Sequence, residues 1–249
     1  MPKLESQPFE SKLDTSSEQF NKNKTSMLSM LEEIDVLLDE AELGGGEHHK
    51  ERLAKRGKLP VRERVFHFLD PDSPFLEISG LAAYKSDYPV GGGAIAGIGV
   101  SAGIECIIFA NDPTVLAGAM HFYSVKKWMR AMQIARDSRL PFIQFVESAG
   151  GDLRPRSNAV VGGTTHFAES GRQFYEITEL SKLNIPTVTV TFGTATAGGA
   201  YQPGMSDYNI FVKDQADVAL AGPPLVQMAT GEISSREDIG GAKMHAEKS

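Results

Sequence analysis

The sequence predicts an α/β fold, and three observations lead to this prediction. Short apolar runs alternate with amphipathic helical segments from residue 115 onward, as in strands that are joined by crossover helices. Two of these runs end in a turn of small residues that contains a glycine pair. With 41% apolar and 23% charged residues, a chain of 249 residues can form a full core, so global disorder is excluded.

Residues 1–70 are predicted to precede the main domain. We expect a disordered lead-in at 1–25, because this stretch is rich in Ser, Lys, Glu and Asn and has few large apolar residues. Residues 26–70 are predicted to form a helical arm, since apolar spacing and charge indicate three helices, at 27–41, 47–56 and 61–69.

The main domain is predicted to cover residues 71–249. Its β-rich runs predict strands at 75–78, 94–100, 104–110, 115–120, 142–146, 187–192, 209–212 and 217–221. The turn at 101–103 joins two of them as a hairpin. Helices are predicted at 122–139, 168–183 and 223–230.

Charge, cysteine and histidine content exclude several classes of protein. A net charge of −7 and a pI near 5.4 argue against a nucleic-acid platform. The single cysteine, Cys106, excludes an intramolecular disulfide framework, and its apolar neighbours predict a buried thiol. The six histidines lack metal-ligand spacing, so no metal site is predicted. We expect a cytoplasmic location, because no segment resembles a membrane span or a signal peptide.

Two glycine pairs lie at equivalent points of successive strand–turn–helix units, FIQFVESAGGDL (142–153) and VTVTFGTATAGGAY (188–201). Backbone amides at the start of a helix are free donors, and two that point at one atom form an oxyanion hole. Alternatively, both segments are tight turns that close crossover units, and the residues alone leave both interpretations open.

Two other motifs are excluded by the residues that surround them. The spacing Gly97-x-Gly99-x-x-Ala102 fits a dinucleotide fingerprint, but a strand follows where a helix is required. Ser148 has Val146 two positions before it in place of glycine, so a nucleophile elbow is not supported.

Basic residues form two clusters, at 49–58 and at Lys126, Lys127 and Arg130 on one predicted helix. Each cluster is either a solvated face or a phosphate-binding surface. An oxyanion hole next to bound phosphates is the arrangement that a coenzyme A thioester requires.

Five segments resemble a known family and follow one another in its order: RGKLPVRERVFHFLDPDSPFLEI, FANDPTVLAGA, LPFIQFVESAGGDL, FGTATAGGAYQPGMSD and ALAGPPLVQMATGE. Over residues 50–249 the chain resembles the N-terminal half of the carboxyltransferase (β) subunit of biotin-dependent acyl-CoA carboxylases. That family includes propionyl-CoA, methylcrotonyl-CoA and geranyl-CoA carboxylases, and the last segment is most similar to the methylcrotonyl-type branch. The resemblance implies a crotonase-like (ClpP/crotonase) fold of repeated ββα units without the family's C-terminal domain. We therefore expect a fragment, one product of a split gene or a truncated form.

The resemblance also implies the site residues. The family's Asp-Ser-Gly-Gly-Ala turn reads Glu147-Ser148-Ala149-Gly150-Gly151 here, which leaves Ala149, Gly150 and Gly151 as candidate donors. The second turn, Ala-Gly-Gly-Ala-Tyr, is intact at 197–201, with Gly198 and Gly199 as catalytic candidates. The candidate substrate-binding residues are Ser148, Arg154, Ala197, Ala200, Tyr201, Lys126 and Arg130.

The implied activity is stabilisation of an acyl-CoA enolate, which is then carboxylated by carboxybiotin. The biotin is carried by a partner, so no covalently bound cofactor is expected, and in the family the biotin itself takes the substrate proton. The implied partners are acyl-CoA, a biotin carboxylase, a biotin carboxyl carrier subunit and further copies of the chain, which form a hexamer in the family. No nucleic acid or membrane partner is expected.

Two other functions stay open. A stand-alone crotonase-like hydratase, isomerase or hydrolase would place carboxylates near the thioester, for which Glu147, Asp152, Glu169 and Glu176 are candidates. A non-catalytic assembly module would use the helical arm to recruit other subunits.

Overall fold

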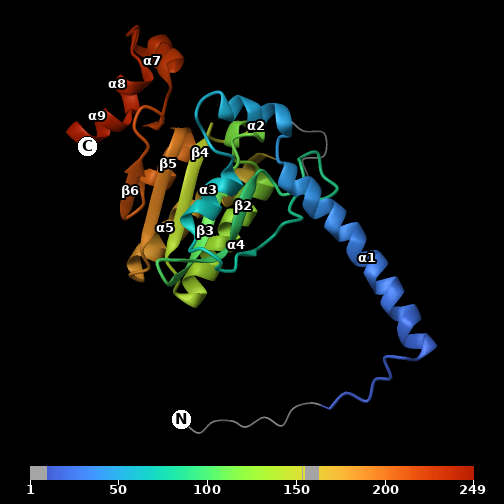
Figure 1. Ribbon diagram of the computed structural model, residues 1–249. Helices are drawn as coiled ribbons and strands as arrows, with labels where there is room; N and C mark the ends of the chain where they lie inside the picture. The colour runs from blue at the N-terminus through green and yellow to red at the C-terminus, as the bar shows by residue number, and fades with distance from the viewer. Residues whose placement is uncertain (1–9, 153, 155–162) are drawn as a thin grey trace.

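The computed structural model describes residues 10–152, 154 and 163–249, with the backbone alone for 163–170. Within these residues, seven strands form one mixed sheet at the centre of the fold (Figure 1). The strands are β1 (Leu76–Glu77), β2 (Ala94–Ser101), β3 (Ile104–Asn111), β4 (Phe142–Ser148), β5 (Thr187–Thr196), β6 (Tyr208–Phe211) and β7 (Asp217–Ala219).

The sheet has an antiparallel part and a parallel part. β1, β2 and β3 are antiparallel neighbours, and the pairing of Ser101 with Ile104 confirms the predicted hairpin. β3, β4, β5 and β6 follow in parallel order, and β7 also pairs with β5. The helices α4 (Phe122–Ser138) and α5 (Gly163–Lys182) lie between successive parallel strands in the chain, which confirms the predicted α/β class.

Helices cover both faces of the sheet because side chains alternate along its buried strands. On one face Phe109 packs with Trp128 of α4 and Ile177 of α5. On the other face Ile108 packs with Val65 of α3 (Val61–Phe68). The third helix of the arm is therefore part of the main core.

Cys106 lies at the start of β3 and is buried, as predicted. Burial, together with the charge of Asp70, raises the pKa of its thiol to about 11. The parallel strands begin at this edge, so the thiol lies at the opposite edge from the two glycine turns.

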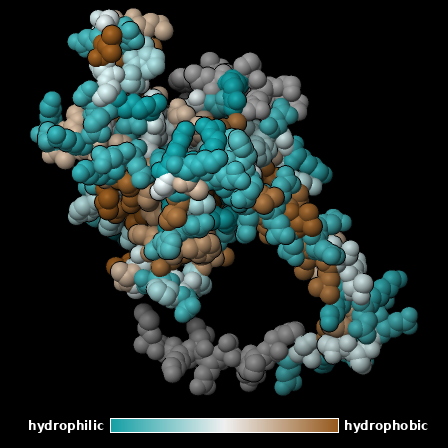
Figure 2. Space-filling model, turned by 45° about the horizontal axis from the view of Figure 1, so that its top comes forward, coloured by the Kyte–Doolittle hydropathy of each residue, from teal (hydrophilic) through white to brown (hydrophobic). Residues whose placement is uncertain are grey.

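The first helix of the arm projects from the body. α1 (Glu18–Leu43) extends away from the sheet (Figure 1) and has no buried residue, and apolar side chains are exposed along it (Figure 2). It begins at Glu18, where the Ser17 side chain accepts a hydrogen bond from the Phe20 amide. Residues 18–25, which were expected in a disordered lead-in, are thus helical. α2 (Glu47–Ala54) follows and buries Leu53.

One predicted strand is wrong. At 115–120 the chain forms a short 3₁₀ helix, η1 (Leu116–Gly118), in which Leu116 and Ala117 adopt positive φ angles of 51° and 54°. Left-handed residues turn the chain away from an extended path. Only Met120 pairs with another segment, through an isolated bridge to Gly151.

The chain after β5 is made of short elements. They are η2 (Ala197–Ala200), α6 (Tyr201–Gly204), α7 (Pro223–Thr230), α8 (Arg236–Gly240) and α9 (Ala242–Lys248), of which α7 has the predicted bounds. Among the described residues, no helix combines the length and apolar character that a membrane crossing needs.

Candidate active site

The two glycine turns lie side by side at the carboxyl ends of β4 and β5. These strands are parallel neighbours, and Ser148 stands opposite Ala195 after a bulge. A Cβ on Gly199 would lie 3.2 Å from the Ser148 side chain, and one on Gly150 would lie 2.9 Å from the Thr196 carbonyl oxygen. The turns therefore contact each other at points where only glycine fits without displacement.

Hydrogen bonding distinguishes the three amides of the first turn. The Ala149 amide donates to the Ala117 carbonyl at 3.1 Å, and the Gly150 amide donates to Ser148 Oγ at 3.2 Å. The bridge to Met120 uses the Gly150 carbonyl and the Asp152 amide, so the Gly151 amide points away from Met120. Within the described residues the Gly151 amide has no acceptor. Ala149 has a negative φ, a conformation that alanine adopts without strain.

The second turn forms the start of a helix. η2 begins at Ala197, which adopts a left-handed φ of 51°, and continues into α6. The first amides of a helix have no acceptor within it, and the Gly198 amide donates to none of the described residues. Gly199 and Ala200 are buried behind the turn.

Both turns line one cavity of about 520 Å³, here called the central cavity. Helices α4, α5 and α6 provide its other walls. Its volume is within the range of small-molecule sites. The lining residues are Met120, Val125, Trp128, Ala149, Gly150, Gly151, Asp152, Gly171, Gln173, Phe174, Ala197, Gly198, Tyr201 and Gln202.

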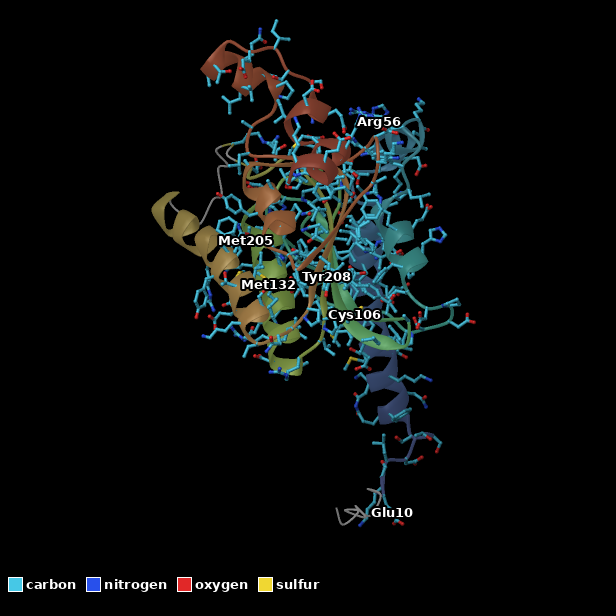
Figure 3. The ribbon with its side chains drawn as sticks, turned by 90° about the vertical axis from the view of Figure 1, so that its left-hand side faces the viewer. Glu10, Arg56, Cys106, Met132, Met205 and Tyr208 are labelled. Atoms are coloured by element: carbon cyan, nitrogen blue, oxygen red, sulfur yellow. The ribbon has the colours of Figure 1, made fainter. Side chains whose placement is uncertain are left out.

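A second cavity of about 470 Å³, here called the basic cavity, adjoins the first turn. His49, Arg52 and Arg56 line it from the helical arm, and Arg236 lines it from α8. Ala149 lines both cavities, so they meet at this residue. Figure 3 shows Arg56 near the top of the molecule, well above Cys106.

Comparisons with known proteins identify the family of the chain. The family model of the carboxyl transferase domain matches residues 52–249. The chain belongs to this family.

Its relatives include the probable biotin-dependent acyl-coenzyme A carboxylase beta2 subunit of Mycobacterium tuberculosis, which is 45% identical over 96% of this chain and 44% of its own length. The probable mitochondrial methylcrotonoyl-CoA carboxylase beta chain of Drosophila melanogaster is 43% identical over 96% of this chain and 41% of its own length. This carboxyl transferase chain thus spans less than half the length of these relatives.

Solved structures give the same fold. The beta subunit of P. aeruginosa geranyl-CoA carboxylase matches with a TM-score of 0.83 and 39% identity, over 96% of this chain and 44% of that one. Transcarboxylase 12S, a hexamer with methylmalonyl-coenzyme A bound, matches with a TM-score of 0.78 and 25% identity, over 88% of this chain and 42% of that one. The carboxyl transferase domain therefore has the predicted crotonase-like fold.

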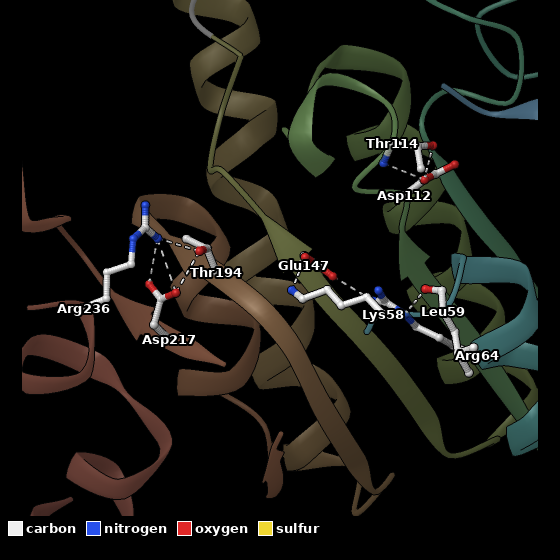
Figure 4. Close-up of polar contacts among 9 residues, drawn as sticks. All are labelled: Lys58, Leu59, Arg64, Asp112, Thr114, Glu147, Thr194, Asp217 and Arg236. Carbon is white, nitrogen blue, oxygen red and sulfur yellow. Dashed lines mark hydrogen bonds and ion pairs between the residues drawn. The ribbon is translucent and has the colours of Figure 1, made fainter. Parts of the chain in front are cut away.

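Glu147 does not face the central cavity of the carboxyl transferase domain. Its carboxylate accepts from Lys58 Nζ at 2.6 Å and from Arg64 Nη1 at 2.9 Å (Figure 4). All three side chains are largely buried, so this carboxylate connects β4 to the helical arm. The sequence did not single out Lys58 or Arg64 for this role, because the pairs span more than eighty positions.

The other candidate carboxylates are also engaged in ion pairs. Glu176 pairs with Arg136 at 2.6 Å and with Arg172 at 3.1 Å. Asp152 lines the central cavity and pairs with Arg154 at 2.7 Å, which places Arg154 next to the first turn. The side chain of Glu169 lies outside the described residues.

The basic residues of α4 do not share one face. Lys126 and Arg130 are exposed, with Lys126 over the Phe122 ring at 4.3 Å, and neither lines the central or the basic cavity. Lys127 is buried and donates to the carbonyls of Ala94 at 2.7 Å and Gly91 at 3.3 Å. Burial lowers the pKa of Lys127 to about 8.

The remaining predicted residues lie in or next to the turns. Tyr201 lines the central cavity, and its ring centroid is 4.7 Å from that of Phe174. Ser148 is buried and holds the first turn through its bond from Gly150. In the part of the chain that the structure describes, no three acidic, cysteine or histidine side chains gather as a metal site would require.

Proposed function

We propose that this chain binds an acyl-CoA thioester in the central cavity and stabilises its enolate during carboxylation. The observation that carries the proposal is that Gly151 and Gly198 line one cavity and that the amides of both lack acceptors among the described residues. An oxyanion that accepts from both would be stabilised where its charge develops.

We assign the phosphates of coenzyme A to the basic cavity. His49, Arg52 and Arg56 converge there, and Arg236 adds a fourth basic side chain that also bonds to Thr194 at 2.7 Å (Figure 4). Arginine binds phosphate oxygens through charge-assisted hydrogen bonds. This assignment replaces Lys126 and Arg130, which lie on the outer face of α4.

The carboxyl group would come from carboxybiotin on a partner protein. In this reaction the thioester loses a proton from a carbon that its carbonyl activates, which is the α-carbon of propionyl-CoA and the γ-carbon of 3-methylcrotonyl-CoA. The resulting enolate attacks carbon dioxide released from carboxybiotin at that carbon, and the biotin takes the proton. Glu147 and Glu176 are held in ion pairs and do not line the central cavity, so we do not expect either of them to act as the base. Assembly with a biotin carboxylase, a carrier subunit and further copies, and the cytoplasmic location, stay predictions.

Isothermal titration of the folded chain with 3-methylcrotonyl-CoA, propionyl-CoA and free CoA tests the proposal. We expect both thioesters to bind more tightly than free CoA, because only they offer a carbonyl to the two amides. A chain that is folded by circular dichroism and binds none of the three would refute it. Turnover of crotonyl-CoA without any biotin component would favour the hydratase alternative.

A further inference from the structure

The turn that precedes α4 has an unusual backbone. In η1, Leu116, Ala117 and Gly118 adopt left-handed φ angles of 51°, 54° and 69° in succession. A side chain disfavours this conformation, so successive left-handed residues persist only where the surrounding structure imposes them. Strained residues of this kind gather at functional sites, and η1 lies directly against the first glycine turn.

Within the described residues, three backbone hydrogen bonds join this part of the chain to the first turn. The Ala149 amide donates to the Ala117 carbonyl at 3.1 Å. The Met120 amide donates to the Gly150 carbonyl at 2.7 Å, and the Met120 carbonyl accepts from the Asp152 amide at 2.8 Å. The residues immediately before and after the proposed donor of this turn are therefore held by the chain that follows η1.

One of these bonds fixes the direction of the Gly151 amide. The Gly150 carbonyl and the Gly151 N–H belong to the same planar, trans peptide unit, so they point in opposite directions. Because Met120 holds the carbonyl at 2.7 Å, the N–H is turned away from Met120. If this unit rotated by half a turn, its carbonyl oxygen would replace the N–H and would repel an oxyanion.

Gly118 allows η1 to approach the first turn. A Cβ on Gly118 would collide with the Glu147 carbonyl oxygen and would lie 3.0 Å from the carbonyl carbon. Glu147 lies at the end of β4, and Lys58 and Arg64 hold its carboxylate. β4 is therefore fixed at this point, and a side chain at position 118 would displace η1 from the turn.

We propose, on the basis of the acyl-CoA function argued above, that Gly118 is a positioning residue for the first oxyanion donor. It lets η1 reach the turn, so that Met120 holds the peptide unit of Gly150 and Gly151 with its N–H available to the thioester carbonyl. A donor that is oriented before the substrate arrives needs no reorganisation during the reaction.

Isothermal titration of the full chain with 3-methylcrotonyl-CoA and free CoA tests the positioning role. The readout is the selectivity, defined as the Kd of free CoA divided by that of the thioester, because a partial loss of folded protein would weaken both equally. We expect Gly118→Ala to lower the selectivity about three- to tenfold, since one hydrogen bond to the carbonyl is lost.

Gly103→Ala is the matched control. Gly103 lies at the tip of the hairpin between β2 and β3 with a φ of 74°, and apart from its chain neighbours no described atom lies within 4 Å of where its Cβ would be. The change introduces a left-handed alanine there as well, but without a collision. The selectivity of this variant should stay within about twofold of the wild type.

Amide hydrogen exchange of the wild type, followed by NMR, tests the geometry without any substitution. Relative to their intrinsic rates, the amides of Ala149, Met120 and Asp152 should exchange about tenfold or more slowly than that of Gly151. The reason is that, within the described residues, these three amides have acceptors and the Gly151 amide has none. Equal protection of all four would overturn the proposal even if Gly118→Ala does not fold.

The outcomes separate this inference from the proposed function. Unchanged selectivity in a Gly118→Ala chain that is folded by circular dichroism would overturn the positioning role while acyl-CoA binding stands. An equal loss of selectivity in Gly103→Ala would also overturn it, because backbone strain and not the collision would then be the cause. Absence of binding for every thioester to the wild type would refute both proposals.

Discussion

Individual glycines in the two turns have different physical roles. Gly150 and Gly199 lie against the opposite turn, so their lack of a side chain permits the contact. Gly151 and Gly198 have open space where a Cβ would be, and neither has a positive φ. At these two positions the proposed function therefore rests on the backbone amide and not on the missing side chain.

Removal of one amide tests this distinction. Gly198→Pro deletes the N–H, whereas Gly198→Ala keeps it. We expect the proline variant to bind 3-methylcrotonyl-CoA about three- to tenfold more weakly, the loss of one hydrogen bond, and the alanine variant to bind normally. Titration calorimetry with thermal melts of both variants checks this, and equal affinities would remove Gly198 from the site.

Lys127 predicts a pH dependence of stability. Its pKa of about 8 in the folded chain lies below the usual value of about 10.4, so the unfolded chain binds more protons between these pH values. The free energy of unfolding should therefore rise with pH from about 8 to 10.4, by up to about 3 kcal/mol from this residue. Urea unfolding of the wild type and of Lys127→Met measures the difference, and parallel pH profiles would contradict the prediction.

At the level of elements, the sequence predicts most of the fold because buried strands and amphipathic helices have distinct periods. It fails at 115–120, where β-rich residues form a turn with left-handed Leu116 and Ala117, a conformation that their side chains do not signal. It also places α1 too late, because residues 18–25 have no apolar stripe and only Ser17 marks the start.

The sequence also predicts only part of the candidate site. Its turns were predictable because a strand followed by a glycine pair is a local pattern. Which basic cluster adjoins them depends on where the tertiary fold places α2, and Glu147 is held by Lys58 and Arg64 across long sequence separations. Tertiary contacts therefore decide which basic cluster lies next to the turns and which residues bind Glu147.

The two basic clusters can be compared directly. Arg52→Gln with Arg56→Gln, both on the arm, should weaken binding of 3-methylcrotonyl-CoA about tenfold or more, since charge-assisted bonds to phosphate are lost. Lys126→Gln with Arg130→Gln, on the outer face of α4, should leave it unchanged. Binding of 3-methylcrotonyl-pantetheine, which lacks the nucleotide phosphates, should be unaffected by either pair. A loss confined to the α4 pair would reverse the assignment.

At the scale of the whole molecule, apolar side chains are exposed on α1 and on the edge strand β6. α1 exposes Met27, Leu31 and Ile34, and the edge strand β6 exposes Tyr208 and Ile210. The chain also spans only 44% of the M. tuberculosis relative and 41% of the Drosophila one. Exposed apolar surface of this extent is typical of a surface that contacts other protein.

The central claim is that two turn amides hold the thioester carbonyl. Isotope-edited infrared difference spectroscopy with a ¹³C-labelled thioester carbonyl in 3-methylcrotonyl-CoA tests it most directly. We predict that the carbonyl stretch shifts to lower frequency on binding to the folded chain, and that the shift is smaller with Gly198→Pro. A bound thioester whose carbonyl frequency equals that in water or higher would contradict the account.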